Sequence, residues 1–284
     1  MFLSGISDEA GKSLDVQIKA HRELGWSHIE LRMVDGRQFT SLSDAEFDVA
    51  YGQLEKAGLK VSCFSSAIAN WARPITGSFE MDLDDLRRSI PRMRRLGCPF
   101  IRIMSWPNKG LELEAWKNEV LRRMKELVRM AEDGGIVLAL ENCDGWASQS
   151  AVHMVDFLRR IDSPALKVVF DTGNPPAHGH NAAAWYLAVK RYIAYVHIKD
   201  CYIDSDEQVR YTWPGEGHGF VRFILDDLLQ GGYDGGISIE PHVAAQIHSG
   251  NMAEANEDSA FRSYVTYGRK LADLFKKLRV SGTP

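Results

Sequence analysis

Short apolar segments alternate with longer amphipathic segments along the whole chain, and this alternation restricts the fold more than any other feature. The segments expected to form strands are 2–6, 28–31, 60–64, 100–104, 136–141, 167–171, 195–199 and 236–240. The segments expected to form helices are 13–24, 43–57, 80–96, 112–133, 148–161, 181–191, 219–230 and 256–278. Strands that alternate with helices through short connections run parallel with right-handed crossovers. Eight such repeats predict a (βα)8 TIM barrel.

Local signals support the expected helix boundaries. Ser43 is followed three residues later by Glu46, which is the pattern of a capped helix start. Gly25, Gly58 and Gly97 each stand between an expected helix and the next expected strand. Glycine at that place can adopt the left-handed conformation that ends a helix.

The length and the first loop favour a closed barrel over an open, doubly wound sheet. The chain has 284 residues, and one barrel takes roughly 250. The loop at 7–12 has no G-x-G-x-x-G phosphate motif of the kind that often follows the first strand of an open sheet. Because there is no linker, low-complexity tract or shift in composition, we expect residues 1–284 to form a single domain.

Composition excludes several classes of protein. The net charge is -4 and there is no long basic run, which argues against a nucleic-acid surface. No apolar run approaches the ~20 residues of a membrane helix, and no signal peptide is visible. The four cysteines are far apart and form no C-x-x-C pair, so reduced thiols are expected. We therefore expect a soluble, cytoplasmic protein that acts on neither nucleic acid nor membrane.

Four ionisable residues stand where consecutive apolar strands end, namely Glu141, Asp171, His197 and Glu240. In a barrel the functional site lies at the C-terminal ends of the strands. Any one of these residues could be a helix cap or a salt-bridge partner. Ionised carboxylates gather at an apolar rim only when their charge is compensated. The set therefore predicts a site for one divalent metal ion, with ligands suited to Mn²⁺, Mg²⁺, Co²⁺ or Zn²⁺.

Two further residues share a strand face with members of this set, because side chains two apart on a strand point the same way. Lys199 is expected beside His197, and His242 beside Glu240. Lys199 could hold a substrate oxygen or stabilise a developing enolate. The alternative is a structural ion pair with a neighbouring carboxylate.

Arg102 and Glu216 complete the candidate substrate contacts. Arg102 is an unusual residue inside a barrel strand, and it could orient a polar substrate or pair with Glu141. Glu216 lies in a G-x-G-x-G run, which we interpret as a tight turn that leads into the seventh helix. The turn could bring Glu216 to the mouth of the barrel.

Five motifs at these strand ends resemble the xylose-isomerase-like barrel superfamily, and within it the sugar phosphate isomerase/epimerase branch. They are Leu-Glu-Asn at 140–142, Phe-Asp-Thr-Gly-Asn at 170–174, Val-His-Ile-Lys-Asp at 196–200, Trp-Pro-Gly-Glu-Gly at 213–217 and Ile-Glu-Pro-His at 239–242. That branch includes inosose isomerases and dehydratases, ketose 3-epimerases and hydroxypyruvate isomerases. The resemblance implies the same four metal ligands. It also implies that Glu141 and Glu240 form the acid/base pair, as the corresponding glutamates do in the epimerases.

The resemblance has limits. Ketose 3-epimerases carry a substrate-binding histidine and arginine where this chain has Asn174 and Ile203. The superfamily also contains DNA-repair endonucleases with three zinc ions. Those enzymes need histidines at the ends of the second and third strands, which here are Glu30-Leu31-Arg32 and Cys63-Phe64-Ser65.

The expected activity is that of a metal-dependent isomerase or epimerase of a sugar, sugar phosphate or inosose. It would move a proton next to the carbonyl of a small polyhydroxylated substrate, through an enediolate that the metal stabilises. One alternative is a dehydratase (lyase), in which the enediolate expels water. Another is a sugar-binding barrel without catalysis. Homo-oligomers are common among barrels of this kind, although the sequence shows no interface.

Overall fold

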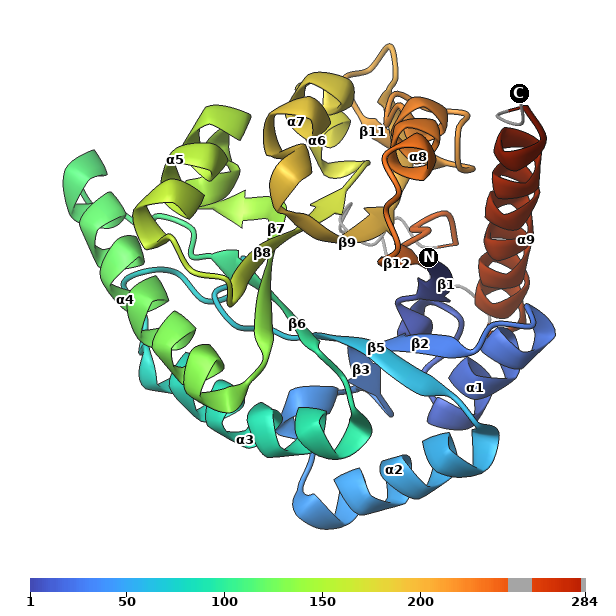
Figure 1. The fold of residues 1–284 in the computed structure, drawn as a ribbon, viewed down its shortest axis with the longest axis horizontal. Coiled ribbons are helices and arrows are strands. Elements are labelled where there is room, and N and C mark those ends of the chain that lie inside the picture. Colours follow the sequence, from blue (N-terminus) through green and yellow to red (C-terminus); the bar gives the residue numbers. More distant parts are fainter. Residues whose placement is uncertain (245–256, 282–284) are drawn as a thin grey trace.

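Eight parallel strands form the central sheet of the protein, in a computed structural model that describes residues 1–244 and 257–281 (Figure 1). Their order in the sheet is β1-β12-β9-β8-β7-β6-β5-β2. Their bounds are β1 (Phe2–Gly5), β2 (His28–Leu31), β5 (Lys60–Ser65), β6 (Phe100–Ser105), β7 (Val137–Gly145), β8 (Leu166–Asp171), β9 (Ile193–Ile198) and β12 (Gly236–Ile239). Each expected strand is present, and the predicted TIM barrel is confirmed.

The barrel closes less tightly between β1 and β2 than elsewhere. Seven neighbouring pairs of strands are joined by parallel ladders of hydrogen bonds. In the described residues, β1 and β2 are joined instead by one bridge between Ile6 and Glu30. The sheet is therefore nearly, but not fully, closed by backbone hydrogen bonds.

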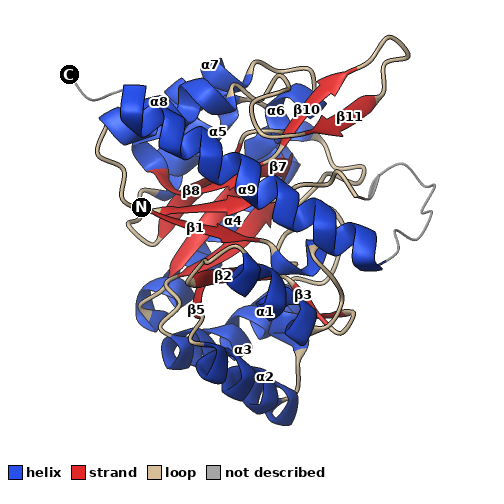
Figure 2. Cartoon of the chain, turned by 90° about the vertical axis from the view of Figure 1, so that its right-hand side faces the viewer, coloured by secondary structure: helices blue, strands red, loops and turns tan. Residues whose placement is uncertain are grey.

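Helices surround the sheet on its outer side (Figure 1). They are α1 (Leu14–Glu23), α2 (Asp44–Ala57), α3 (Glu80–Leu96), α4 (Leu113–Gly134), α5 (Ala151–Ile161), α7 (Ala182–Val189), α8 (Val221–Gln230) and α9 (Glu257–Ser281). Figure 2 shows α9 running across the strands near the N-terminus, where it packs against α1 and α8. Each expected helix is present, except that residue 256, the expected first residue of the last helix, lies outside the described residues. No helix in the described ranges is long and apolar enough to cross a membrane.

The boundary signals act as expected. The Ser43 hydroxyl accepts a hydrogen bond from the Glu46 amide, and the Glu46 side chain accepts one from the Ser43 amide. Gly25, Gly58 and Gly97 have φ angles of 68°, 69° and 64°. A side chain is disfavoured in this left-handed conformation, so glycine suits these helix ends.

Several short elements between the main strands and helices were not expected. They are the hairpins β3 (Met33–Val34) with β4 (Arg37–Gln38) and β10 (Asp200–Ile203) with β11 (Val209–Thr212), the short helix α6 (Asn174–Ala177), and the 3-10 turns η1 (Ser7–Glu9), η2 (Phe39–Ser41), η3 (Trp146–Gln149) and η4 (Lys190–Tyr192). The hairpin β10–β11 stands out from the barrel (Figure 2). The helix expected from 148 begins at Ala151, because the Ser150 hydroxyl caps it by accepting from the His153 amide.

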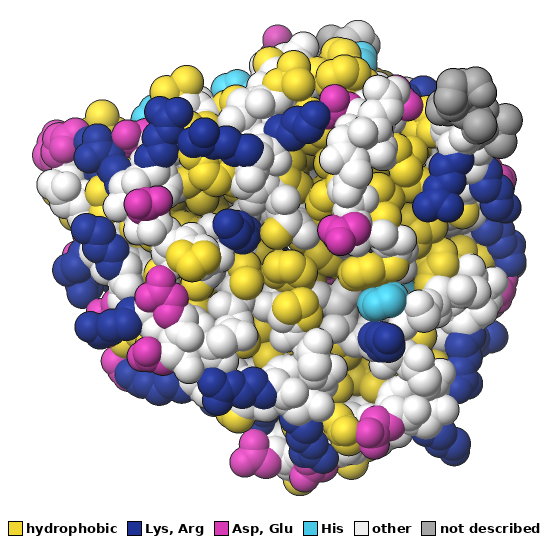
Figure 3. Space-filling view, in the orientation of Figure 1, with side chains coloured by type: hydrophobic (Ala, Val, Ile, Leu, Met, Phe, Trp, Pro, Cys, Tyr) yellow, Lys and Arg dark blue, Asp and Glu magenta, His cyan; other side chains and the backbone are white. Residues whose placement is uncertain are grey.

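The interior of the barrel is polar in part. Ser62 lies within hydrogen-bonding distance of both the Ser4 hydroxyl (2.9 Å) and the Tyr195 hydroxyl (2.8 Å), and all three residues are buried. The four cysteines are free. On the face seen in Figure 3, hydrophobic side chains gather toward the centre and charged side chains lie nearer the rim. Many of the buried charges lie at the C-terminal ends of the strands, and others, such as Asp82, Asp85, Arg92 and Arg123, lie on α3 and α4.

Candidate metal centre

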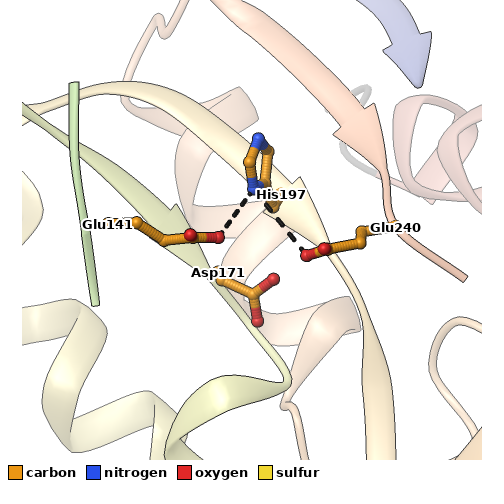
Figure 4. A group of neighbouring side chains, drawn as sticks. All are labelled: Glu141, Asp171, His197 and Glu240. Atoms are coloured by element: carbon orange, nitrogen blue, oxygen red, sulfur yellow. Dashed lines mark hydrogen bonds and ion pairs between the residues drawn. The ribbon is translucent and has the colours of Figure 1, made fainter. Parts of the chain in front are cut away.

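The four residues expected to bind a metal do come together. Glu141 lies in β7, Asp171 ends β8, His197 lies in β9 and Glu240 follows β12, and these four strands are adjacent in the sheet. All four side chains are buried, and one ligand atom from each lies within 4.8 Å of the ligand atoms of the other three. Figure 4 shows the carboxylates and the imidazole converging on a common point. The parallel register produces this arrangement, because Asp171 pairs with His197 and His197 with Ser238.

Asp171 presents one free oxygen to this point. Its Oδ1 accepts hydrogen bonds from the backbone amides of Gly173 (2.8 Å) and Asn174 (2.7 Å). Its Oδ2 is buried and has no hydrogen-bond partner in the part of the chain that the structure describes, although the Lys199 ammonium lies 3.2 Å away. Burial, reinforced by nearby Glu240 and Glu141, raises the pKa of Asp171 to about 7 despite Lys199. Protein groups alone therefore leave part of the negative charge of the ionised Asp171 carboxylate unbalanced.

His197 lies between two carboxylates. Its Nδ1 is 3.0 Å from Glu141 Oε1, and its Nε2 is 3.0 Å from Glu30 Oε1. Burial disfavours the charged ring, but Glu30 and Glu141 outweigh burial and hold the pKa of His197 well above its usual range. The Nδ1 atom therefore faces the other three residues of the cluster, and the Nε2 atom contacts Glu30.

Lys199 and Arg102 are both ion-paired with members of the cluster. The Lys199 ammonium is 2.9 Å from Glu240 Oε2, and Arg102 Nη1 donates to Glu141 Oε2 at 3.0 Å. Both cations are buried. Of the two roles considered for each from the sequence, the ion pair is the one present in this structure.

Glu240 is held on both oxygens. Arg32 Nη1 donates to its Oε1 at 3.1 Å, while Lys199 binds its Oε2. Arg32 also donates to Asp8 and lies 3.5 Å from Glu9 Oε1. Burial acts to raise the pKa of Glu240, but Lys199, His242 and Arg32 together hold it well below its usual range. Glu240 is therefore ionised at neutral pH.

His242 lies beside Glu240, as its position two residues further on predicts. Its Nδ1 is 2.7 Å from Glu9 Oε1, and its Nε2 is 3.7 Å from Glu240 Oε1. The Tyr211 ring packs edge-on against the imidazole at 5.0 Å. His242 is thus a buried neighbour of the cluster and is linked to the first loop of the chain.

Glu216 has a half-exposed side chain in the glycine-rich turn before α8. Its side chain is 50% exposed, and its carboxylate pairs with Lys270 of α9 at 3.2 Å. The structure does not bring it into the cluster with the four acidic and imidazole ligands.

The glycine-rich run around Glu216 has a different structural role. The backbone amides of Gly215, Gly217 and Gly219 all donate to the carboxylate of Asp200, at 2.8, 3.0 and 2.8 Å. A Cβ on Gly217 would lie 2.4 Å from Asp200 Oδ1, so the close approach requires glycine. This loop fixes the residue that directly follows Lys199.

Four site residues were missed by the sequence reasoning, namely Asp8, Glu9, Glu30 and Arg32. Glu30 is fully buried in β2, and Arg32 follows this strand. The signal for both was their alternation with the apolar Ile29 and Leu31, since an acid and a base two apart on a short strand share its inner face.

The charges of the cluster suit a divalent cation. Asp8, Glu9, Glu30, Glu141, Asp171 and Glu240 are six mostly buried carboxylates, and Arg32, Arg102 and Lys199 supply three fixed positive charges. The excess is three negative charges when His197 is neutral and two when it is protonated. Such an excess is costly at a buried site. Carboxylate oxygens with one imidazole nitrogen form a ligand set for Mg²⁺, Mn²⁺, Co²⁺ or Zn²⁺. The residues present therefore fit a metal.

Comparison with known proteins gives the family. The profile of the family described as "Xylose isomerase-like TIM barrel" matches residues 18–264. The chain therefore belongs to the xylose isomerase-like TIM barrel family.

Two curated relatives match part of the chain. An inosose dehydratase of Clostridium beijerinckii is 26% identical over 141 residues, which are 45% of this chain and 47% of that protein. An uncharacterised protein of Methanocaldococcus jannaschii is 31% identical over 142 residues, 45% of this chain and 46% of that protein. The chain thus spans about half the length of the curated relatives it matches.

Solved structures share the fold over nearly the whole chain. The IolI protein with a bound zinc atom has a TM-score of 0.74 and 17% identity, covering 98% of this chain and 99% of that one. A xylose isomerase-like barrel of Mycobacterium smegmatis in complex with magnesium has a TM-score of 0.70 and 19% identity, covering 96% and 97%. The D-allulose 3-epimerase of a Methylomonas species, in complex with D-allulose, has a TM-score of 0.69 and 17% identity, covering 98% and 96%. At these identities the likeness establishes the fold.

Proposed function

We propose that the protein is a divalent-metal-dependent isomerase or epimerase that moves a proton next to the carbonyl of a small polyhydroxylated substrate. Glu141, Asp171, His197 and Glu240 would hold the ion. A cation bound there would polarise the substrate carbonyl and offset negative charge on its oxygen. Relatives whose structures contain zinc or magnesium support such a site.

One observation carries the proposal, namely a pair of glutamates contributed by two strands that are not neighbours. Glu141 comes from β7 and Glu240 from the end of β12, and their ligand oxygens lie within 4.8 Å of each other. A substrate carbon between them could lose a proton to one glutamate in its carboxylate form, and the other glutamate, if it had taken up a proton from solvent, could return one. Positioned acid/base groups of this kind contribute about 10²–10⁴-fold to a rate.

Basic residues hold both glutamates in place. Arg102 binds Glu141, whereas Arg32 and Lys199 bind the two oxygens of Glu240. These contacts fix the carboxylates before a substrate arrives, so little reorganisation is needed during proton transfer. In this proposal, Lys199 and His242 also face the substrate, because both lie beside Glu240 on the inner side of the barrel mouth.

The proposed substrate is a keto-sugar or an inosose. The inosose dehydratase and the D-allulose 3-epimerase among the similar proteins support this class. Ile203, where ketose 3-epimerases have a substrate-binding arginine, is 41% exposed on the hairpin β10–β11. Inososes are therefore the first substrates to test.

Exchange of the substrate proton with solvent tests the proposal. In deuterated water, the metal-loaded protein should introduce deuterium next to the carbonyl of a turned-over keto-sugar or inosose, as followed by NMR. Glu240→Gln should abolish the exchange, while the control Glu114→Gln should not, because Glu114 is 72% exposed on α4. Undiminished exchange by folded, metal-loaded Glu240→Gln would refute the assignment.

A dehydratase is the second candidate, and the matching inosose dehydratase favours it. The same proton removal would then be followed by loss of a β-hydroxyl as water. Mass spectrometry of the product separates the two reactions, because isomerisation leaves the mass unchanged and dehydration lowers it by one water. Tight binding of a sugar without exchange or product would instead indicate a sugar-binding barrel.

A further inference from the structure

We infer that Glu30 is a positioning residue that fixes His197 in the tautomer and orientation needed to bind the metal. This inference rests on the metal site proposed above. It concerns a side chain outside the four ligands, on a strand that supplies none of them.

Glu30 reaches His197 across the interior of the barrel. It lies in β2, which is not adjacent to β9 in the sheet, and its side chain is fully buried. Its Oε1 is 3.0 Å from His197 Nε2 and also accepts a hydrogen bond from the Ser65 hydroxyl at 2.6 Å. Ser65 thereby holds the carboxylate in line with the ring.

The contact determines which ring nitrogen is free to bind a cation. A carboxylate only accepts hydrogen bonds, so in the metal-free protein both ring nitrogens carry a proton, Nε2 toward Glu30 and Nδ1 toward Glu141. A cation held by the four ligands would replace the proton on Nδ1, and Glu30, which is not one of these ligands, would keep the proton on Nε2. The Nδ1 atom points to the cluster, 3.0 Å from Glu141 Oε1 and 4.0 Å from Glu240 Oε2, while Nε2 points away (Figure 4).

The fold alone gives no reason for a charge at this place. The neighbours of Glu30 in β2, Ile29 and Leu31, are apolar and point to the other face of the strand. Glu30 instead faces the barrel interior, where Ser65, Ser238 and His197 lie against its carboxylate. A buried carboxylate is costly. Its role at the His197 imidazole accounts for its presence.

Metal affinity and the state of the imidazole test the inference together. Zinc binding would be measured by competition with a chromophoric chelator, for the 284-residue chain and its Glu30→Leu and Glu30→Gln variants. Loss of a carboxylate behind a metal-binding histidine typically weakens binding about 10–100-fold. We expect a loss in this range for Glu30→Leu and a smaller loss for Glu30→Gln, whose amide oxygen can still accept from Nε2.

The matched control is Asp82→Asn. Asp82 is also a buried carboxylate, but it accepts hydrogen bonds from Trp106 and from the Ala69 amide and has no contact with the cluster in the described residues. Zinc affinity within about twofold of the wild type is expected for this variant. The control separates the loss of a buried charge from the loss of the imidazole contact.

Nitrogen-15 NMR of the histidines in the zinc-loaded protein gives the second measurement. We expect His197 to show a protonated Nε2 and a zinc-bound Nδ1 in the wild type, and a shifted Nε2–H signal in Glu30→Gln. Unchanged affinity and an unchanged His197 signal in folded Glu30→Gln would overturn the inference, even if Glu30→Leu does not fold. A wild-type protein that binds no zinc, magnesium, manganese or cobalt would overturn the proposed metal site itself.

Discussion

Metal binding should stabilise the fold by an amount that can be worked out in advance. A cation that binds only the folded state adds about 2.7 kcal/mol when its concentration is 100 times its Kd. A chain of 284 residues has an unfolding entropy of ~0.6 kcal/mol/K, at ~2.1 cal/mol/K per residue. These values give a rise in Tm of about 5 °C. Differential scanning fluorimetry, with and without a chelator, would measure it for each of the four candidate metals.

The variant Asp171→Asn should have a higher Tm than the wild type without metal, and its Tm should not rise when metal is added. An asparagine can still accept the two amide hydrogen bonds at Oδ1, but it removes the buried charge that has no hydrogen-bond partner. Because burial raises the pKa of Asp171 to about 7 in the metal-free protein, its ionised form destabilises the fold at pH 8. We expect the metal-free variant to melt several degrees above the metal-free wild type, and to lose the rise on adding metal. The control is Asp156→Asn, in an exposed pair with Arg160, which should change neither quantity.

A full rise in the Tm of Asp171→Asn on adding metal, or no rise in the Tm of the wild type with any divalent metal, would refute a metal site at Asp171. A metal-free variant that melts below the wild type would show that Asp171 is compensated in a way the charges described here do not explain.

Three further outcomes concern stability. Burial lowers the pKa of His21 to about 4, so as the pH falls the unfolded chain takes up this proton before the folded protein does. The free energy of unfolding should therefore decrease below pH 6.5, by about 2 kcal/mol at pH 5. Urea unfolding should show this loss in the wild type and a smaller loss in His21→Gln. Gly217→Ala places a Cβ 2.4 Å from Asp200 and should cost about 1–3 kcal/mol, so an unchanged urea midpoint would contradict the role given to this loop. Gly52→Ala in α2 meets nothing within 4 Å and should stabilise the fold by about 0.5–1 kcal/mol, which a Tm no higher than that of the wild type would refute.

The barrel and its four converging ligands could be predicted from the sequence because each depends on local order. Periodicity identifies the strands, and parallel strands bring their ends to one rim, so Glu141 and Asp171 had to lie near each other. The same rule placed Lys199 with His197 and His242 with Glu240. These predictions needed no knowledge of any loop.

The remaining features depend on contacts between distant segments. The partner of Arg102 was left open, because a cation inside a barrel can face either substrate or carboxylate. The partner of Glu216 could not be predicted either, because Asp200 shapes the turn and α9 supplies Lys270. The contact between Glu30 and His197 could not be predicted for the same reason, because these residues are 167 positions apart in the sequence.

The loose junction between β1 and β2 has a consequence for how the barrel holds together. Where one backbone bridge replaces a ladder, side chains span the gap, because Arg32 after β2 binds Asp8 after β1 and Glu240 after β12. Electrostatic attraction, unlike a ladder of amides, is lost when the carboxylates are protonated. The opening of this junction should therefore depend on pH, and amide exchange in the first two strands would report both barrel breathing and occupancy of the mouth.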